Sequence, residues 1–133
     1  MAGTQDYQSR FKRLQGGGVA YDVRNRTTSL TLTAEDSGSI FIAGAVDLVF
    51  TLPATDFGLV FTFVVKTPSV TTGLVVAPVA VDKVMGNGFT SLDNKGAVNT
   101  PGTDREGDLI EVTGDGLDGW YITRVVGAWA RVA

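Results

Sequence analysis

The chain contains no cysteine and no histidine among its 133 residues. Without cysteine there is no disulfide framework. Without histidine there is no Ser-His-Asp or Cys-His catalysis, no histidine metal site and no histidine pH switch. An enzyme built from this chain would depend on carboxylates, lysine, tyrosine or a bound cofactor. We therefore expect a protein that is not an enzyme and that uses neither a metal nor a cofactor.

Long apolar runs are also missing from the sequence. No run reaches the roughly 18 apolar residues that span a membrane, and the N-terminus lacks the apolar core of a signal peptide. We expect synthesis in a cytoplasm and no membrane partner. The content of 44% hydrophobic and 19% charged residues is that of an ordinary globular protein, and the length suits one domain with its own core.

The net charge of −3 conceals two regions of opposite sign. Residues 1–26 carry five basic and two acidic side chains, a net +3, whereas residues 27–133 carry 6 basic and 12 acidic ones, a net −6. An acidic body argues against nucleic acid as a partner. The basic leader could contact phosphates, or it could be a docking arm or plain solvated surface, and we favour the second interpretation.

Residues 1–18 differ from the rest of the chain. Tyr7, Phe11 and Leu14 are spaced i, i+4 and i+7, as on one face of a short helix that would be marginal without a partner surface. The run of three glycines that follows is a flexible hinge. We therefore expect an N-terminal arm and hinge over residues 1–18 and a β domain over residues 19–133.

The β domain is predicted from short alternating runs separated by turn residues. SLTLTA, SIFIAG and DLVFTLP are rich in residues that favour strands. GLVFTFVVKT places Phe61, Phe63 and Val65 on one face and further valines on the other, so we expect a central strand covered on both faces. The runs recur about every 8–12 residues, which indicates an all-β sandwich, jelly roll or small barrel. We expect a jelly-roll or β-sandwich-like single domain.

Two features interrupt this pattern. Pro78 predicts either an edge strand or a break in its strand. Residues 86–104 form a long, polar, glycine-rich segment with at most one short strand. Such a segment exceeds ordinary loop lengths, so we expect it to be functional or to pack against an external surface.

The stretch GDGLDGWYIT, residues 114–123, suggests a metal-binding loop, a sugar-binding corner or a turn. An EF-hand loop would require a glutamate at the twelfth position counted from Asp115, where the chain has Val126. The flanking runs DLIEVT and WYITRVV instead favour a β-hairpin whose glycines adopt positive φ.

Trp120 and Trp129 have two interpretations, and so do the acids that precede them. Indole rings within strands serve as core or subunit-interface residues, which we favour, or as a platform for a sugar ring. The acids would suit glycoside cleavage only if two of them faced one cleft, and solvated charge is the simpler interpretation. These acids are Asp104, Glu106, Asp108 and Glu111.

The stretch LTLTAEDSGSIFIAGAVDLVFTLPATDFGLVFTFVVKTPS resembles a pattern in short structural proteins of tailed bacteriophages. Its elements are T-A-x-D-S-G, T-L-P-A and G-L-x-F-x-F, followed later by G-D-x-I-E-V and a D-G turn before a W-Y pair. The resemblance covers residues 30–70 and 107–123. Its motifs are turn and core residues, which specify a fold rather than a chemistry.

The resemblance implies a capsid decoration (cement) protein. Such proteins are jelly-roll-like or β-tulip homotrimers that bind the outside of the phage head and clamp neighbouring major capsid proteins. It implies no catalytic residues, and a location on the virion exterior after assembly in the host cytoplasm. We expect capsid or subunit contacts from Tyr7, Arg10, Phe11, Arg13, Leu14, Trp129 and Val132.

The alternative is a receptor- or glycan-binding module of a phage tail or head fibre. It would expose Trp120 or Tyr121 beside Asp115 and Asp118. A carboxylate-based hydrolase ranks last, because no further feature singles out an acid–base pair.

Overall fold

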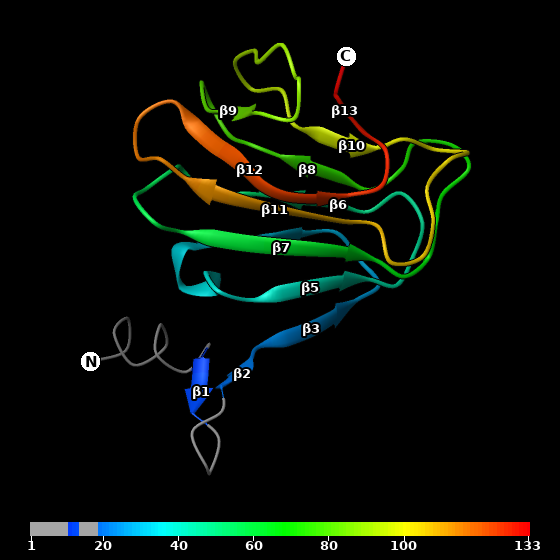
Figure 1. Ribbon diagram of the computed structural model, residues 1–133, viewed down its shortest axis with the longest axis horizontal. Coiled ribbons are helices and arrows are strands. Elements are labelled where there is room, and N and C mark those ends of the chain that lie inside the picture. The colour runs from blue at the N-terminus through cyan, green and yellow to red at the C-terminus, as the bar shows by residue number, and fades with distance from the viewer. Residues whose placement is uncertain (1–10, 14–18) are drawn as a thin grey trace.

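A computed structural model describes the backbone of residues 11–13 and 19–133 and the side chains from Tyr21 onward. Two β-sheets pack face to face around one hydrophobic core, and so form a β-sandwich (Figure 1). The all-β sandwich predicted from the strand spacing is therefore confirmed. Within the described residues, no helix is long and apolar enough to cross a membrane.

The larger sheet forms the front layer in Figure 1. Its six strands are, in spatial order, β3 (Val23–Arg26), β5 (Ile40–Ala43), β7 (Val60–Val65), β11 (Leu109–Gly114), β12 (Gly119–Val126) and β9 (Lys83–Met85). We call the surface of this sheet that points away from the core the outer face.

The smaller sheet covers the other side of the core. Its five strands are, in spatial order, β13 (Trp129–Arg131), β10 (Ala97–Asn99), β8 (Val75–Ala77), β6 (Val49–Thr51) and β4 (Leu30–Thr31). A short 3-10 helix, Ala34–Asp36, lies between β4 and β5.

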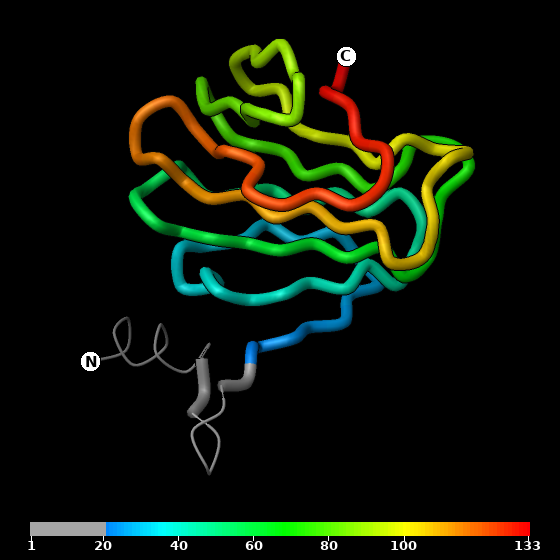
Figure 2. Tube along the Cα trace, in the orientation of Figure 1, coloured from blue at the N-terminus to red at the C-terminus, as the bar shows by residue number. Residues whose placement is uncertain are grey.

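The first half of the domain is a flattened coil of parallel strands. In the larger sheet β3, β5 and β7 run parallel, and in the smaller sheet β4, β6 and β8 do the same. The chain thus changes sheet after each strand, a course that can be followed in Figure 2. Pairing becomes antiparallel where β11 joins β7 and β10 joins β8. Alternation alone does not reveal this, because parallel and antiparallel strands share the same two-residue period.

The centre of the core is a group of three phenylalanines from successive strands of this coil. Phe41 and Phe63 stack with ring centroids 5.8 Å apart, and Phe50 from the opposite sheet lies 5.2 Å from Phe63. All three side chains are fully buried. Stacked and tilted aromatic pairs at these separations stabilise the packing of the two sheets beyond their buried area alone.

β7 lies at the middle of the larger sheet, between β5 and β11, as predicted for a central strand. Phe61, Phe63 and Val65 point into the core. The expectation that both faces are covered is wrong within the described residues. Val60 and Val64 point to the outer face and are only partly buried, because the second sheet covers one side only.

The N-terminal segment forms a small two-stranded sheet. β1 (Phe11–Arg13) pairs antiparallel with β2 (Val19–Tyr21), so the expected helical stripe is wrong at residues 11–13. Pairing with β2 supplies backbone hydrogen bonds, whereas an isolated three-turn helix is marginal. Residues 1–10 and 14–18, which include the rest of the predicted stripe and the glycine hinge, lie outside the described residues.

The two interruptions in the sequence pattern appear in the structure. β8 ends at Ala77, directly before Pro78. Residues 86–104 contain one short strand, β10, which runs between β8 and β13. The break at Pro78 and the single short strand within residues 86–104 are therefore confirmed, and β10 belongs to the sandwich itself. That residues 86–104 are functional or pack against an external surface stays a prediction.

Candidate binding surfaces

The GDGLDGWYIT stretch is the tight connection of a β-hairpin between β11 and β12, as predicted. The Oδ1 atom of Asp115 accepts hydrogen bonds from the N–H groups of Leu117, Asp118 and Gly119, at 2.8, 2.9 and 3.0 Å. Burial raises the pKa of Asp115, but the hydrogen bonds from Gly119, Leu117 and Asp118 outweigh it and hold the pKa below its ordinary value of 3.8. The carboxylate thus organises the turn.

The same carboxylate was a candidate metal ligand. Across residues 11–13 and 19–133, no three acid, histidine or cysteine side chains come together in a way that would hold a metal ion. The Oδ1 atom of Asp115 instead faces the backbone N–H groups of its own loop.

Three loops meet at the end of the sandwich where β7 and β12 begin. Thr55 joins them, because its N–H donates to Asp82 Oδ2 at 2.9 Å and its hydroxyl donates to the Gly119 carbonyl at 2.6 Å. The N–H of Gly116 donates back to the Thr55 hydroxyl at 3.2 Å. We call residues 53–58, 79–82 and 115–118 together the loop end. These cross-links hold the three loops as one unit.

The loop end exposes large apolar side chains. Phe57 is 77% exposed, Leu117 is 78% exposed and Val81 is 66% exposed. The side chains of Asp56 and Asp118 are exposed beside them. Apolar side chains gathered on a surface and bordered by polar groups are typical of protein interaction sites. Hydrogen-bonded loops present them with little loss of conformational freedom on binding.

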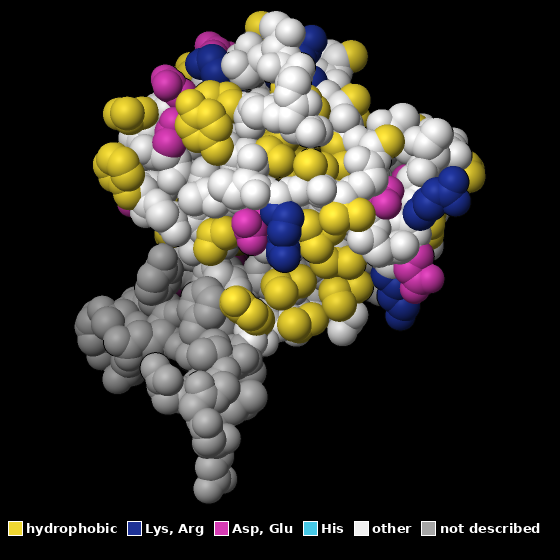
Figure 3. Space-filling view, viewed as in Figure 1, with side chains coloured by type: hydrophobic (Ala, Val, Ile, Leu, Met, Phe, Trp, Pro, Cys, Tyr) yellow, Lys and Arg dark blue, Asp and Glu magenta, His cyan; other side chains and the backbone are white. Residues whose placement is uncertain are grey.

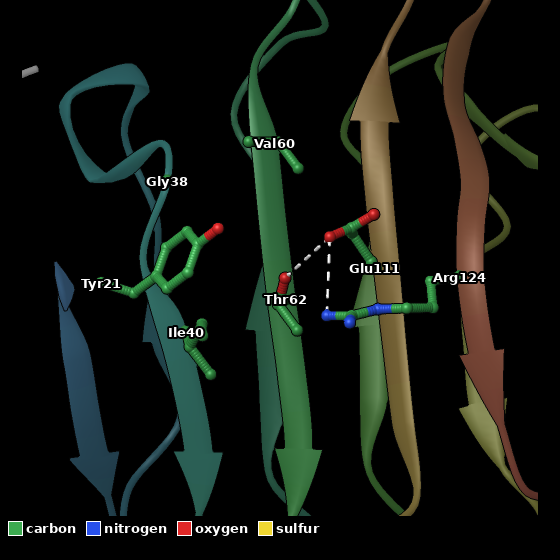
Figure 4. A pocket seen from close by; sticks show the side chains of 7 residues that line it. All are labelled: Tyr21, Gly38, Ile40, Val60, Thr62, Glu111 and Arg124. Atoms are coloured by element: carbon green, nitrogen blue, oxygen red, sulfur yellow. Dashed lines mark hydrogen bonds and ion pairs between the residues drawn. The ribbon is translucent and has the colours of Figure 1, made fainter. Parts of the chain in front are cut away.

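A shallow hollow of about 280 Å³ lies on the outer face, and its lining is shown in Figure 4. Arg124 reaches across from β12 toward Glu111 on β11, with 3.7 Å between Nη2 and Oε2. Glu111 also accepts hydrogen bonds from Thr123 at 2.8 Å and from Thr62 at 3.4 Å. The hollow is lined by Tyr21, Gly38, Ile40, Val60, Thr62, Glu111 and Arg124.

Aliphatic side chains surround this ion pair. Figure 3 shows hydrophobic side chains gathered over β5, β7 and β11 on the face toward the viewer. Strand register places Ile40, Ile42 and Val64 on this side, since their neighbours along each strand point into the core. A second hollow, of about 440 Å³, lies farther along the same strands beside Val64 and Lys66.

Both tryptophans belong to the core. Trp120 is 0% exposed and packs against Phe61 with ring centroids 5.6 Å apart. Trp129 is 7% exposed, and its indole N–H donates to the Val126 carbonyl at 2.9 Å. The hypothesis that the Trp120 ring is a platform for a sugar is therefore wrong. Tyr121, the other aromatic of that hypothesis, is 49% exposed on the outer face.

The four clustered acids have separate environments. Asp104 accepts a hydrogen bond from the Ser69 N–H, and Asp108 is buried against Asn99. Glu111 lies on the outer face with Arg124, and Glu106 is exposed. The paired carboxylates that glycoside cleavage requires are not formed by these four acids.

The sequence-predicted contact residues fall into three groups. Tyr7, Arg10 and Leu14 lie outside the described residues. The backbone of Phe11 and Arg13 forms part of β1. At the other end of the chain, Trp129 faces the core, and Val132 is half-buried with its N–H donating to the Gly96 carbonyl.

Sequence reasoning did not single out the loop end or the outer face. A signal existed for the loop end, because Phe57 and Leu117 each stand in a turn between aspartate and glycine, where a polar residue is usual. The outer face was visible only as the valines on the second side of GLVFTFVVKT.

A comparison with models of protein families finds no match, and a search of curated proteins finds no relative.

Proposed function

We propose that this protein is a non-enzymatic capsid decoration protein of a tailed bacteriophage. It binds the outer surface of the head and stabilises the lattice of the major capsid protein, as a homotrimer. Its place is the virion exterior, and it acts by contact alone.

The observation that carries this proposal is the loop end. Phe57, Val81 and Leu117 project from three loops that hydrogen bonds join into one unit. Rigid apolar projections of this kind suit insertion between subunits of a lattice, because they bury apolar area without first having to become ordered. The resemblance of residues 30–70 and 107–123 to phage structural proteins supports the same proposal.

Multiple weak contacts suit the proposed role. A homotrimer presents three loop ends and three N-terminal segments at once, so modest single contacts combine into stable attachment. The N-terminal segment contributes Tyr7, Arg10, Phe11, Arg13 and Leu14, a mixture of apolar and basic side chains that suits an acidic or apolar groove.

Copy number in the virion that encodes the chain tests the proposal. Quantitative mass spectrometry of purified particles should find hundreds of copies, as expected for a protein spread over a capsid lattice. A few dozen copies or fewer would contradict decoration and favour the receptor- or glycan-binding module of a fibre.

A second experiment tests the N-terminal segment. A chain that lacks residues 1–15 should fold, as judged by circular dichroism, and should no longer sediment with expanded capsids. Replacing Tyr7, Phe11 and Leu14 by serine should have the same effect. Replacing Gln5, Gln8 and Gln15 by serine is the matched control and should leave binding intact. Undiminished binding by the truncated chain would disprove the role of this segment.

A further inference from the structure

We propose that the outer face of the six-stranded sheet is the surface through which copies of this chain associate with one another. The inference rests on the homotrimer of the proposed function and assigns it an interface. It does not depend on the capsid.

The first argument is the composition of the outer face. The outward positions of β5 are Ile40 and Ile42, and those of β7 include Val60 and Val64. At the margins, Val23 is 50% exposed and Val126 is 52% exposed. A sandwich that faces water normally alternates apolar residues inward with polar residues outward. Here β5 is apolar on both sides, and Thr62 is the one polar residue among the outward positions of β7, which approaches the pattern of a sheet covered twice.

The second argument is the charge of this face. At the edge strand β9, Lys83 points outward and forms an ion pair with Asp93 at 2.7 Å. On the other five strands of the sheet, Glu111 and Arg124 are the only ionised side chains among the described residues that point outward. They carry opposite signs and lie on adjacent strands. A face with one acid and one base is complementary to itself, since Glu111 of one copy can meet Arg124 of the next.

Charge also favours a second copy over a differently charged partner. Residues 27–133 carry a net −6, so copies of the protein repel one another over most of their surface. The outer face between β3 and β12 has no net charge, so two acidic copies can approach one another there. A strongly basic partner would gain little at this neutral face.

The dimensions of the face fit an interface. The six strands contain 31 residues, which at about 3.3 Å per residue and about 4.8 Å between strands give roughly 490 Å² of planar area for each copy. Two such faces supply about 1,000 Å², the lower bound of a specific interface. The outer side of the smaller sheet is also apolar, but its strands contain only two or three residues each. That side is therefore the natural control surface.

Light scattering coupled to size exclusion tests the assignment with the full chain. The wild type should have three times the mass of one chain, or about 42 kDa against 14.0 kDa. Val64→Lys buries a charge at the interface and should give a monomer with an unchanged circular dichroism spectrum. Val75→Lys, at the corresponding outward position of the smaller sheet, should keep the mass of the wild type. A monomeric wild type, or an oligomeric Val64→Lys, would overturn the inference.

Charge reversal provides a second test that does not depend on the stability of Val64→Lys. Glu111→Arg and Arg124→Glu should each weaken association, because each variant confronts like charges across the contact. An equal mixture of the two variants should recover part of the association, since a ring of three copies then contains two contacts between opposite charges and one between like charges. If association is weakened in each variant and does not recover at all in the mixture, Glu111 and Arg124 act in the folding of the monomer. The proposed contact between Glu111 of one copy and Arg124 of the next would then be wrong.

The inference and the proposed function fail in different ways. A monomeric wild type that still binds capsids would overturn the interface and leave capsid decoration intact. A wild type that is oligomeric, becomes monomeric on Val64→Lys and does not bind capsids would overturn capsid decoration and leave the interface intact. If the wild type is monomeric and its outer face becomes accessible to a hydrophobic dye only after deletion of residues 1–10, the chain covers its own face, and the interface is wrong.

Discussion

Asn99 and Asp108 form a buried hydrogen bond at the end of the sandwich, with 3.0 Å between Nδ2 and Oδ2. Asn99 lies in β10 of the smaller sheet, and Asp108 directly precedes β11 of the larger one. The same amide donates to the Ala128 carbonyl at 3.2 Å, and the Arg105 N–H donates to the carboxylate at 3.0 Å. This polar cluster connects the two sheets where three segments converge.

Removing the amide should therefore destabilise the whole domain. Asn99→Ala leaves the Asp108 carboxylate and the Ala128 carbonyl each without one donor, and we expect a loss of about 2–3 kcal/mol in the free energy of unfolding. Urea denaturation monitored by tryptophan fluorescence measures it. Thr90→Ala, at an exposed loop position, is the control and should change the free energy by no more than about 0.5 kcal/mol. Equal effects of the two substitutions would contradict the role of the cluster.

The Asp115 carboxylate should make stability depend on pH. Its pKa in the folded state is lowered, so its contribution is fully present above the ordinary value of 3.8 and is lost as pH falls through the folded-state pKa. Asp115→Ala should lower the free energy of unfolding by about 1–2 kcal/mol at pH 7, because three N–H groups lose their acceptor. The difference in the free energy of unfolding between the variant and the wild type should become smaller as the pH falls below 3.8. Urea midpoints at neutral and acidic pH measure both effects, and a gap that does not depend on pH would refute the role of the charge.

Gly119 should tolerate no side chain. Its φ is 151°, and a Cβ at this position would collide with the backbone of Lys83 on β9. We expect Gly119→Ala to lower the free energy of unfolding by about 2–4 kcal/mol, because β9 and β12 would have to separate. Gly88→Ala separates collision from backbone strain, because Gly88 also has positive φ but a Cβ there meets open space. That control should cost about 1 kcal/mol. A cost as small for Gly119→Ala as for the control would rule out the collision.

The loop end should contribute to partner binding without contributing to folding. Phe57→Ser and Leu117→Ser replace exposed side chains, so each should change the free energy of unfolding by no more than about 0.5 kcal/mol. Under the proposed function, the double variant should bind capsids at least about tenfold more weakly. Val70→Ser, which replaces a side chain that is 87% exposed at the opposite end of the sandwich, should bind as the wild type does. Equal capsid affinity of the double variant and the wild type would remove the loop end from the interface.

The hairpin shows how far local sequence carries a prediction. DLIEVT and WYITRVV alternate in period two, and the aspartate and glycines between them suit a tight turn, so β11, β12 and their connection could be read directly. The N-terminal segment shows the limit of such reading. Its three apolar residues match a helical period, yet residues 11–13 pair as a strand, because a distant partner strand decides the outcome for so short a stretch.

The binding surfaces were less accessible to sequence reasoning than the fold. Phe57 and Leu117 come from loops about 60 residues apart, and only the contacts of Thr55 place them at one end of the sandwich. Glu111 looked like a member of an acidic cluster, because its neighbours in sequence are acids. Strand pairing gives it a different neighbour, Arg124, and thereby changes its environment from acidic to neutral.

The sequence by itself determined that this chain is an all-β protein with a two-sided apolar central strand, because side-chain period and turn residues act over a few positions. Tertiary structure alone decided that the first strands run parallel, that both tryptophans are buried, and which side of β7 stays uncovered. The physical reason is that strand direction and burial depend on hydrogen bonds and contacts between segments far apart in the chain. A strand of alternating residues is compatible with several such arrangements, and the packing of the Phe41, Phe50 and Phe63 rings selects among them.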